Sequence, residues 1–324
     1  MARPDRRVWW NAAGLVLGVA ALVWTFWKID TAGLLEALAR SRPLFVVLVG
    51  LGAFAIMATK AWRWHIVITA SERLPLRLVA FATFVGFFAN AVLPARAGEV
   101  VRVVLLGQRA GVSKTTLLAA MGVDKLLEGV GMVAVLVSLP LFGPTPLWFR
   151  SATWVVGALL AALLVAGAVI GSSREHPWLA RLPLSPRWRD RLSRFLAKLA
   201  SGFAALRSPG HLLGALAVAV GIWFLQAVVV WTCLRSVHLD LTLLDAFVVL
   251  MAVNIGGMAP AAPGSVGTFE LSAVLALEFL GVDKTQALAF ALVYHGVQLV
   301  PTVVLGLAAL PLMRVSLREL RQAP

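Results

Sequence analysis

Charged side chains lie inside otherwise apolar stretches of this sequence, and the first group follows Asn90. It contains three ionisable residues at steps of three: Arg96, Glu99 and Arg102. On a helix that begins after Pro94 this spacing places the three on one face, so Glu99 neutralises one arginine and one positive charge remains. A surplus positive charge near a helix N-terminus favours a phosphate or another anionic headgroup. The alternative is that this tip reaches water and solvates its charges by snorkelling.

The second group opens a later apolar stretch with two acids one helical turn apart. Asp124 and Glu128 are four residues apart, with Lys125 between them, so both acids share a helix face. Ionisable residues inside a membrane segment are functional candidates by default. Two roles follow, namely proton uptake for ion-coupled transport, or a fixed salt bridge to Arg96 or Arg102 that ties the segment to its neighbours.

The third group, from Asn254 to Glu270, is rich in glycine and proline and poor in charge. Such a backbone cannot be continuously helical. Its exposed amides need protein or water around them, so this tip must be buried or must line a cavity. Glu270 is the only ionisable group of the tip, and Tyr294, His295 and Gln298 on the next apolar stretch are candidate partners. A lone intramembrane histidine also serves as a packing residue, which is the alternative.

No catalytic or metal-binding motif accompanies these groups. The glycine-rich stretch at 256–267 lacks the Lys-Ser/Thr ending of a phosphate-binding loop. The five histidines and the single Cys233 show no ligand-like spacing. We therefore expect substrate binding without catalysis, cofactor or metal. The residues expected to contact the substrate are Asn90, Pro94, Arg96, Gly98, Glu99, Arg102, Asp124, Lys125, Glu128, Asn254, Pro263, Gly264, Gly267, Glu270 and His295.

The composition requires that a membrane-embedded fold positions these residues. Hydrophobic residues make up 60% of the chain and charged residues 14%, and the mean hydropathy is +0.89. Soluble domains carry about a quarter charged residues, so a water-soluble fold is excluded. The net charge of +14 then belongs in cytoplasmic loops that face anionic headgroups, and we expect no nucleic-acid partner.

Apolar stretches of about 20 residues, the length that crosses a bilayer, predict the membrane helices. Two further stretches, 78–107 and 244–280, are interrupted by proline, glycine, asparagine and charge, and each is predicted to be a pair of short helices with a non-helical tip. Trp27 and Lys28 make a poor cleavage context, so the first span is not a removed signal peptide. The full spans are predicted at about 8–27, 44–64, 117–140, 151–171, 211–235 and 286–311.

Basic residues orient the spans, because cytoplasmic loops are enriched in lysine and arginine. Lys60 and Arg63 mark the cytoplasmic end of the second span, and both termini are predicted to be cytoplasmic. Both flanks of the first interrupted stretch are basic, so it enters and leaves from inside, whereas the second begins outside at Asp245. The segment 172–210 is a basic cytoplasmic loop. Within it, 188–206 is either an amphipathic helix on the inner leaflet or a solvated basic loop.

A short motif occurs in both halves of the chain. Gly111–Thr115 (GVSKT) corresponds to Gly281–Thr285 (GVDKT), each directly after an interrupted stretch and before a full span. Because the interrupted stretches enter from opposite faces, the repeats at about 44–140 and 211–311 have inverted topology, as in many transporters. We therefore expect one integral membrane domain over 1–324. Its fold class is all-α, a polytopic helical bundle with two inverted repeats that each contain a re-entrant broken-helix hairpin.

Three runs resemble the lysylphosphatidylglycerol synthase transmembrane-region family of flippase-like membrane proteins. They are the run from Asn90 to Arg102, DKLLE at 124–128 and PGSVGTFE at 263–270, and the resemblance covers about residues 10–312. Ser265 stands where the family commonly has another glycine. The resemblance implies two oppositely oriented re-entrant hairpins and movement of lipid between leaflets.

The resemblance also bears on the substrate. Bifunctional members move aminoacylated phospholipid and carry a soluble aminoacyl-transfer domain after the membrane part, whereas stand-alone relatives are associated with other lipids or lipid-linked glycans. This chain ends at Pro324, so we expect a stand-alone member that does not synthesise lysylphosphatidylglycerol, and the lipid that it moves stays open.

The leading hypothesis is a lipid translocase of the cell inner membrane. Its partner is a membrane lipid with a charged headgroup, which enters between the two tips, and the inverted repeat supplies alternating access. One alternative is a secondary transporter of a small polar solute, driven through Asp124 and Glu128. The other is a non-transporting scaffold whose basic loop recruits an envelope-biosynthesis enzyme.

Overall fold

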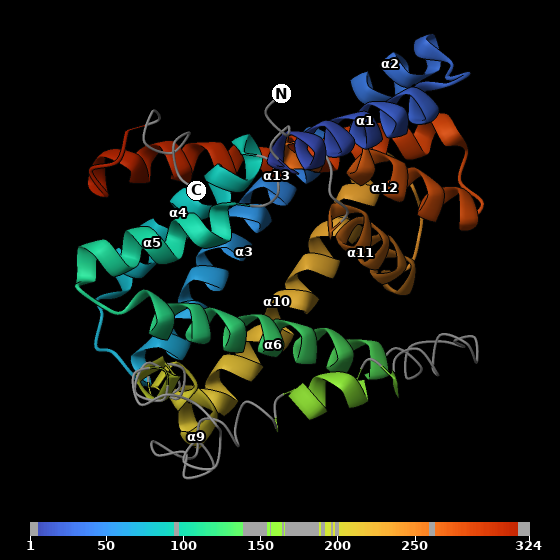
Figure 1. The fold of residues 1–324 in the computed structure, drawn as a ribbon. Coiled ribbons are helices and arrows are strands. Elements are labelled where there is room, and N and C mark those ends of the chain that lie inside the picture. Colours follow the sequence, from blue (N-terminus) through green and yellow to red (C-terminus); the bar gives the residue numbers. More distant parts are fainter. Residues whose placement is uncertain are drawn as a thin grey trace. The chain divides into compact units, whose positions relative to one another are not determined.

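The computed structural model describes residues 6–93, 97–138, 154–155, 157–163, 165, 188, 192–195, 197, 201–258 and 263–316. Every regular element in these residues is helical (Figure 1), as the sequence predicts. The elements are α1 (Arg6–Phe26), α2 (Thr31–Ala39), α3 (Pro43–Thr69), α4 (Leu76–Val92), α5 (Gly98–Ala110), α6 (Lys114–Ser138), α9 (Ala204–Arg207), α10 (Pro209–Ser236), α11 (Leu243–Met258), the 3₁₀ turn η4 (Pro263–Ser265), α12 (Thr268–Phe279) and α13 (Lys284–Leu312).

Three of the described helices are long and apolar enough to cross a membrane alone. They are α3, α10 and α13, of 27, 28 and 29 residues. The described part of α1 passes the same test together with α2, although the two are bent by 91°. α6 has 25 residues, but its charged group lowers its hydropathy. The chain is therefore a multi-pass helical membrane protein, while about half of the predicted span at 151–171 lies outside the described residues.

Each interrupted stretch forms two short helices, as predicted. In the first stretch, α4 and α5 approach closely because Gly98 has no side chain: a Cβ there would overlap the carbonyl of Gly86. In the second stretch, a Cβ on Gly256 of α11 would overlap Ser272 of α12. The glycines thus allow the members of each pair to pack backbone against backbone.

The order and lengths of the helices repeat along the chain. From α3 to α6 the helices have 27, 17, 13 and 25 residues, and from α10 to α13 they have 28, 16, 12 and 29. The repeated sequence motif lies at the same junction in both series. Gly111 (φ +67°) and Gly281 (φ +83°) adopt the left-handed conformation there, which costs a residue with a Cβ about 1–2 kcal/mol.

The chain forms two compact units. The first comprises residues 1–57, 84–101 and 225–324. In it, α12 packs against α11, α13 and α1, and α13 packs against α2. Lys284 at the start of α13 donates to the carbonyls of Trp24 and Trp27, each at 3.1 Å. This lysine therefore caps the C-terminus of α1, where a cation is favoured.

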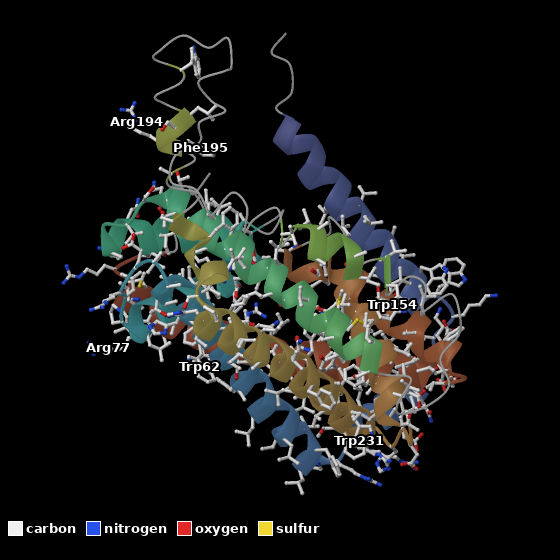
Figure 2. The ribbon with its side chains drawn as sticks, turned by 90° about the horizontal axis from the view of Figure 1, so that it is seen from below. Trp62, Arg77, Trp154, Arg194, Phe195 and Trp231 are labelled. Carbon is white, nitrogen blue, oxygen red and sulfur yellow. The ribbon has the colours of Figure 1, made fainter. Side chains whose placement is uncertain are left out.

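The second unit comprises residues 58–83 and 102–224. Trp64 and Leu127 are among its fully buried side chains. Trp223 of α10 donates to the carbonyl of Glu128 on α6 at 2.8 Å. Trp62 projects outward from α3 (Figure 2) and is 50% exposed, as expected of a side chain that faces lipid.

The basic loop falls mainly outside the described residues. Of the segment predicted as an amphipathic helix, residues 192–195 are helical, and Phe195 among them is exposed (Figure 2).

Candidate functional site

Three buried side chains from different helices form a charged triad in the second unit. Arg63 of α3 donates through Nε to Oδ1 of Asp124 on α6 at 2.8 Å. Nη2 of Arg102 on α5 lies 3.7 Å from Oδ2 of the same carboxylate. These three side chains are at most 4% exposed. Asp124 is thus held between two guanidinium groups.

Further charges extend the triad along α6, one turn beyond Asp124. Glu128 Oε2 lies 3.4 Å from Arg63 Nη2 and accepts a hydrogen bond from Lys125 Nζ at 3.1 Å. Its Oε1 lies 3.9 Å from Lys60 Nζ. The outer members are more exposed, because Lys60 is 24%, Glu128 20% and Lys125 48% exposed. We call this set the basic cluster: Lys60, Arg63, Arg102, Asp124, Lys125 and Glu128.

An aromatic ring covers one arginine of the basic cluster. The guanidinium carbon of Arg102 lies 4.4 Å from the centre of the Trp64 ring, within the range of a cation–π interaction. Trp64 is fully buried, so this face of Arg102 is shielded from solvent.

The basic cluster carries more positive than negative charge. Within its six residues, four basic side chains and two acids give a formal charge of +2. Nη1 of Arg63 is buried and has no hydrogen-bond partner among the described residues. Leaving a buried donor unsatisfied costs about 1–3 kcal/mol, and more for a charged group. Nη1 is therefore a natural position for an oxygen of a bound anion.

The triad differs from the sequence prediction in the arginine that lies closest to Asp124. Of the two roles considered for Asp124, the structure contains the ion pair with Arg102, one of the two arginines named for it, but Arg63 makes the shorter contact. By sequence Arg63 only marked the end of a span. Its position inside α3, six residues before Thr69, is the signal that could have identified it, because charge within a membrane helix is rarely incidental.

Residues of the first tip, which joins α4 to α5, have structural contacts of their own. Asn90 Oδ1 accepts a hydrogen bond from the backbone N–H of Gly98 at 2.8 Å, so α4 caps the N-terminus of α5. Glu99 is half-buried in the first turn of α5, where a negative charge is favoured. The predicted residues Pro94 and Arg96 lie outside the described residues.

In the second tip, the stretch from Asn254 to Glu270 that joins α11 to α12, Glu270 lies against His295 of α13, as the sequence suggested. Glu270 Oε1 lies 2.5 Å from Nδ1 of His295, and its Oε2 accepts from the backbone N–H of Gly267 at 2.7 Å. The other ring nitrogen, Nε2, lies 3.1 Å from the carbonyl oxygen of Gly264. The ring of Phe269 stacks on the imidazole at 4.3 Å between centroids. Glu270 and His295 are 4% and 7% exposed.

The backbone of the second tip is held in conformations that favour glycine. Gly264 (φ +69°) and Gly267 (φ +93°) are left-handed, and so is Ser265 (φ +60°) between them. Ser265 is the position at which the resembling family commonly has glycine, and the positive φ accounts for that preference. A Cβ on Gly267 would overlap the carbonyl of Gly18 on α1, so the tip packs directly against that helix.

Other predicted residues of the second tip play local roles. Pro263 opens η4, and Asn254 donates to the carbonyl of Leu250 within α11 at 2.8 Å. The two tips are neighbours within the first unit, because a Cβ built on Gly264 would lie 3.6 Å from the carbonyl oxygen of Ala91 at the end of α4.

Comparison with known proteins agrees with this architecture. Residues 11–306 match the family described as the lysylphosphatidylglycerol synthase TM region. The chain is also similar to a UPF0104 membrane protein of Methanothermobacter thermautotrophicus strain Delta H, with 23% identity over 94% of this chain and 96% of that protein. The chain therefore belongs to the lysylphosphatidylglycerol synthase transmembrane-region family.

Proposed function

We propose that this chain is a lipid translocase that moves a phospholipid or another phosphate-bearing lipid between the leaflets of the cell inner membrane. The observation that carries the proposal is Nη1 of buried Arg63, which has no hydrogen-bond partner among the described residues, within a basic cluster of formal charge +2. A phosphate oxygen matches that donor, because guanidinium groups bind phosphate with both charge and directed hydrogen bonds.

The anionic headgroup provides the negative charge and the acceptor oxygen that the basic cluster lacks, while the acyl chains of the lipid stay in the bilayer. The more exposed Lys60 and Lys125 offer a first electrostatic contact, and Arg63 offers a second, buried one. A graded series of cations lowers the cost of moving an anion away from water, which is the main barrier to crossing a bilayer.

Two inverted repeats would supply alternating access. The matching helix series α3–α6 and α10–α13 supports this part of the proposal. When the register of the shared motif is continued into α6 and α13, Asp124 and Lys125 align with Tyr294 and His295. The two polar centres, the basic cluster and the Glu270–His295 pair, are thus built from equivalent positions of the last helix in each series.

The rival functions receive less support. Proton-driven transport through Asp124 and Glu128 requires acids that are free to titrate, whereas each of these acids faces at least two cations. The scaffold hypothesis rests on the basic loop, which lies mainly outside the described residues. Neither rival accounts for a buried arginine nitrogen without a hydrogen-bond partner among the described residues.

Reconstitution into vesicles tests the proposal. Movement of fluorescent phosphatidylglycerol between leaflets is measured for the wild type, Arg63→Gln, Arg96→Ala and protein-free vesicles. A hydrogen bond to a charged group contributes about 1.5–3 kcal/mol, so we expect Arg63→Gln to slow movement by about ten- to a hundredfold.

The matched control is Arg40→Gln, since Arg40 pairs with Glu36 on α2 and its side chain is 73% exposed. It should move lipid at the wild-type rate. The proposal fails if wild-type and protein-free vesicles move lipid equally fast, or if Arg63→Gln matches the wild type.

A further inference from the structure

The contact between Glu270 and His295 requires a proton. The carbonyl oxygen of Gly264 can only accept, so Nε2 of His295 carries a hydrogen and donates to it. Nδ1 then faces Glu270 Oε1 at 2.5 Å. Without a proton between them, a nitrogen lone pair and a carboxylate oxygen would repel each other at this distance. The pair therefore holds one proton, either on the imidazole or on the carboxyl group.

That proton lets His295 hold both sides of the second tip by hydrogen bonds. Through Nε2 the imidazole holds the carbonyl of Gly264, and through Nδ1 it holds Glu270, whose other oxygen accepts the N–H of Gly267. Neutral histidine carries a single N–H. When the proton is lost, His295 can donate to Glu270 or to Gly264 but not to both, so one side of the tip is released.

Other ionisable groups do not replace this proton. Those on α11, α12, α13 and residues 15–26 of α1 are Asp245, Glu278, Lys284 and Tyr294, apart from the pair itself. The first three stand near helix ends. Each lies eight or more residues along its helix from the pair or from the tip, which corresponds to roughly 12 Å or more at 1.5 Å per residue. Tyr294 packs against the rings of Phe269 and Phe290.

We infer that Glu270 and His295 form a proton-binding site that fastens the second tip, and that loss of the proton frees the tip. The inference concerns α12, α13 and the tip between α11 and α12, and it holds whether or not the chain moves lipid. In a transporting protein, such a site would couple the position of the tip to the proton gradient.

A spin label on the tip tests this inference. Cys233 is the only cysteine, so Cys233→Ala gives a cysteine-free chain in which Val266→Cys, a position 36% exposed, carries the label. Label mobility is recorded in detergent from about pH 5 to about pH 9, the range in which histidine ordinarily titrates. We expect an immobile label at low pH and a mobile one at high pH, in a one-proton transition.

Two variants and one control decide whether the pH response of the label belongs to Glu270 and His295. His295→Gln and Glu270→Gln should each abolish the transition, whereas Glu278→Gln on the same helix α12 should keep it. The inference is overturned if the label on the unsubstituted tip does not respond to pH, or if the transition persists in both His295→Gln and Glu270→Gln.

A second measurement uses the wild-type sequence and does not depend on the folding of a variant. Nitrogen-15 NMR of the five histidines distinguishes protonated from bare ring nitrogens. One buried histidine should show a protonated Nε2 and a proton shared at Nδ1 at low pH. A bare Nε2 on that histidine under these conditions would refute the site. Neither measurement involves lipid movement, so its result is separate from that of the translocation assay.

Discussion

At the scale of single residues, the buried Arg63 and Arg102 share one carboxylate, that of Asp124. A guanidinium group is effectively never deprotonated in proteins, so its burial must be compensated by its neighbours. Asp124 supplies both contacts, and Trp64 covers the face of Arg102. Asp124 is thus an anchor that orients the two arginines, and Nη1 of Arg63 has no hydrogen-bond partner among the described residues.

The anchoring role predicts a large effect of Asp124→Asn on stability. Removal of one partner of a buried ion pair leaves uncompensated charge and costs about 3–5 kcal/mol. Thermal unfolding in detergent should show a markedly lower midpoint for this variant. In the control, Asp240→Asn breaks the ion pair of Asp240, whose side chain is 84% exposed, with Arg235, and should cost at most about 1 kcal/mol. Equal midpoints for the two variants would contradict the anchoring role.

At the scale of helices, glycine determines how the split helices pack. Gly98 and Gly256 stand where α4 meets α5 and where α11 meets α12, and neither position has room for a methyl group. Direct backbone packing holds each pair together without long side chains. In the described part of the first tip, the N–H of Gly98 is satisfied locally by the side chain of Asn90.

Gly98→Ala and Gly256→Ala should therefore destabilise the protein by roughly 1–3 kcal/mol each, the usual cost of overpacking. Gly221→Ala on α10 is the matched control, because a Cβ there meets nothing within 4 Å and alanine favours a helix by about 0.5–1 kcal/mol over glycine. Thermal unfolding midpoints should fall for the first two variants and hold or rise for the third. A fall of the same size at Gly221 would show that packing is not the cause.

Local features of the sequence predicted much of this architecture. The proline, glycine and charge at 94–99 and 256–267 predicted two split helices, because such residues interrupt a helix wherever they occur. The sequence offered Tyr294, His295 and Gln298 as groups that could face Glu270, and the structure places His295 against it. The Arg63–Asp124 contact joins residues 61 positions apart. Side-chain chemistry does not determine which of several intramembrane arginines meets which acid, because that choice depends on tertiary packing.

At the scale of the whole molecule, alternating access requires two helix series that cross the membrane in opposite directions. The loops that precede the split helices, 70–75 and 237–242, should then lie on opposite faces, the first inside and the second outside. The repeated lengths of the helices make the two loops equivalent in position. This arrangement is what would allow one series to open as the other closes.

Cysteine labelling of cells tests the inverted arrangement. In the Cys233→Ala background, an impermeant maleimide should label Asp240→Cys on intact cells, and should label Arg73→Cys only after the membrane is permeabilised. Both residues are exposed on the protein, so a difference reports the membrane side. Labelling of both positions from the same side would contradict the inverted repeat.

The central claim is that the basic cluster carries a phosphate-bearing headgroup across the membrane. It is tested most directly by comparing two fluorescent lipids in the same vesicles, phosphatidylglycerol and a neutral glycolipid without phosphate. The wild type should move phosphatidylglycerol faster, and Arg63→Gln should lose this preference by slowing phosphatidylglycerol alone. Equal rates for both lipids in the wild type, or an unchanged preference in Arg63→Gln, would contradict it.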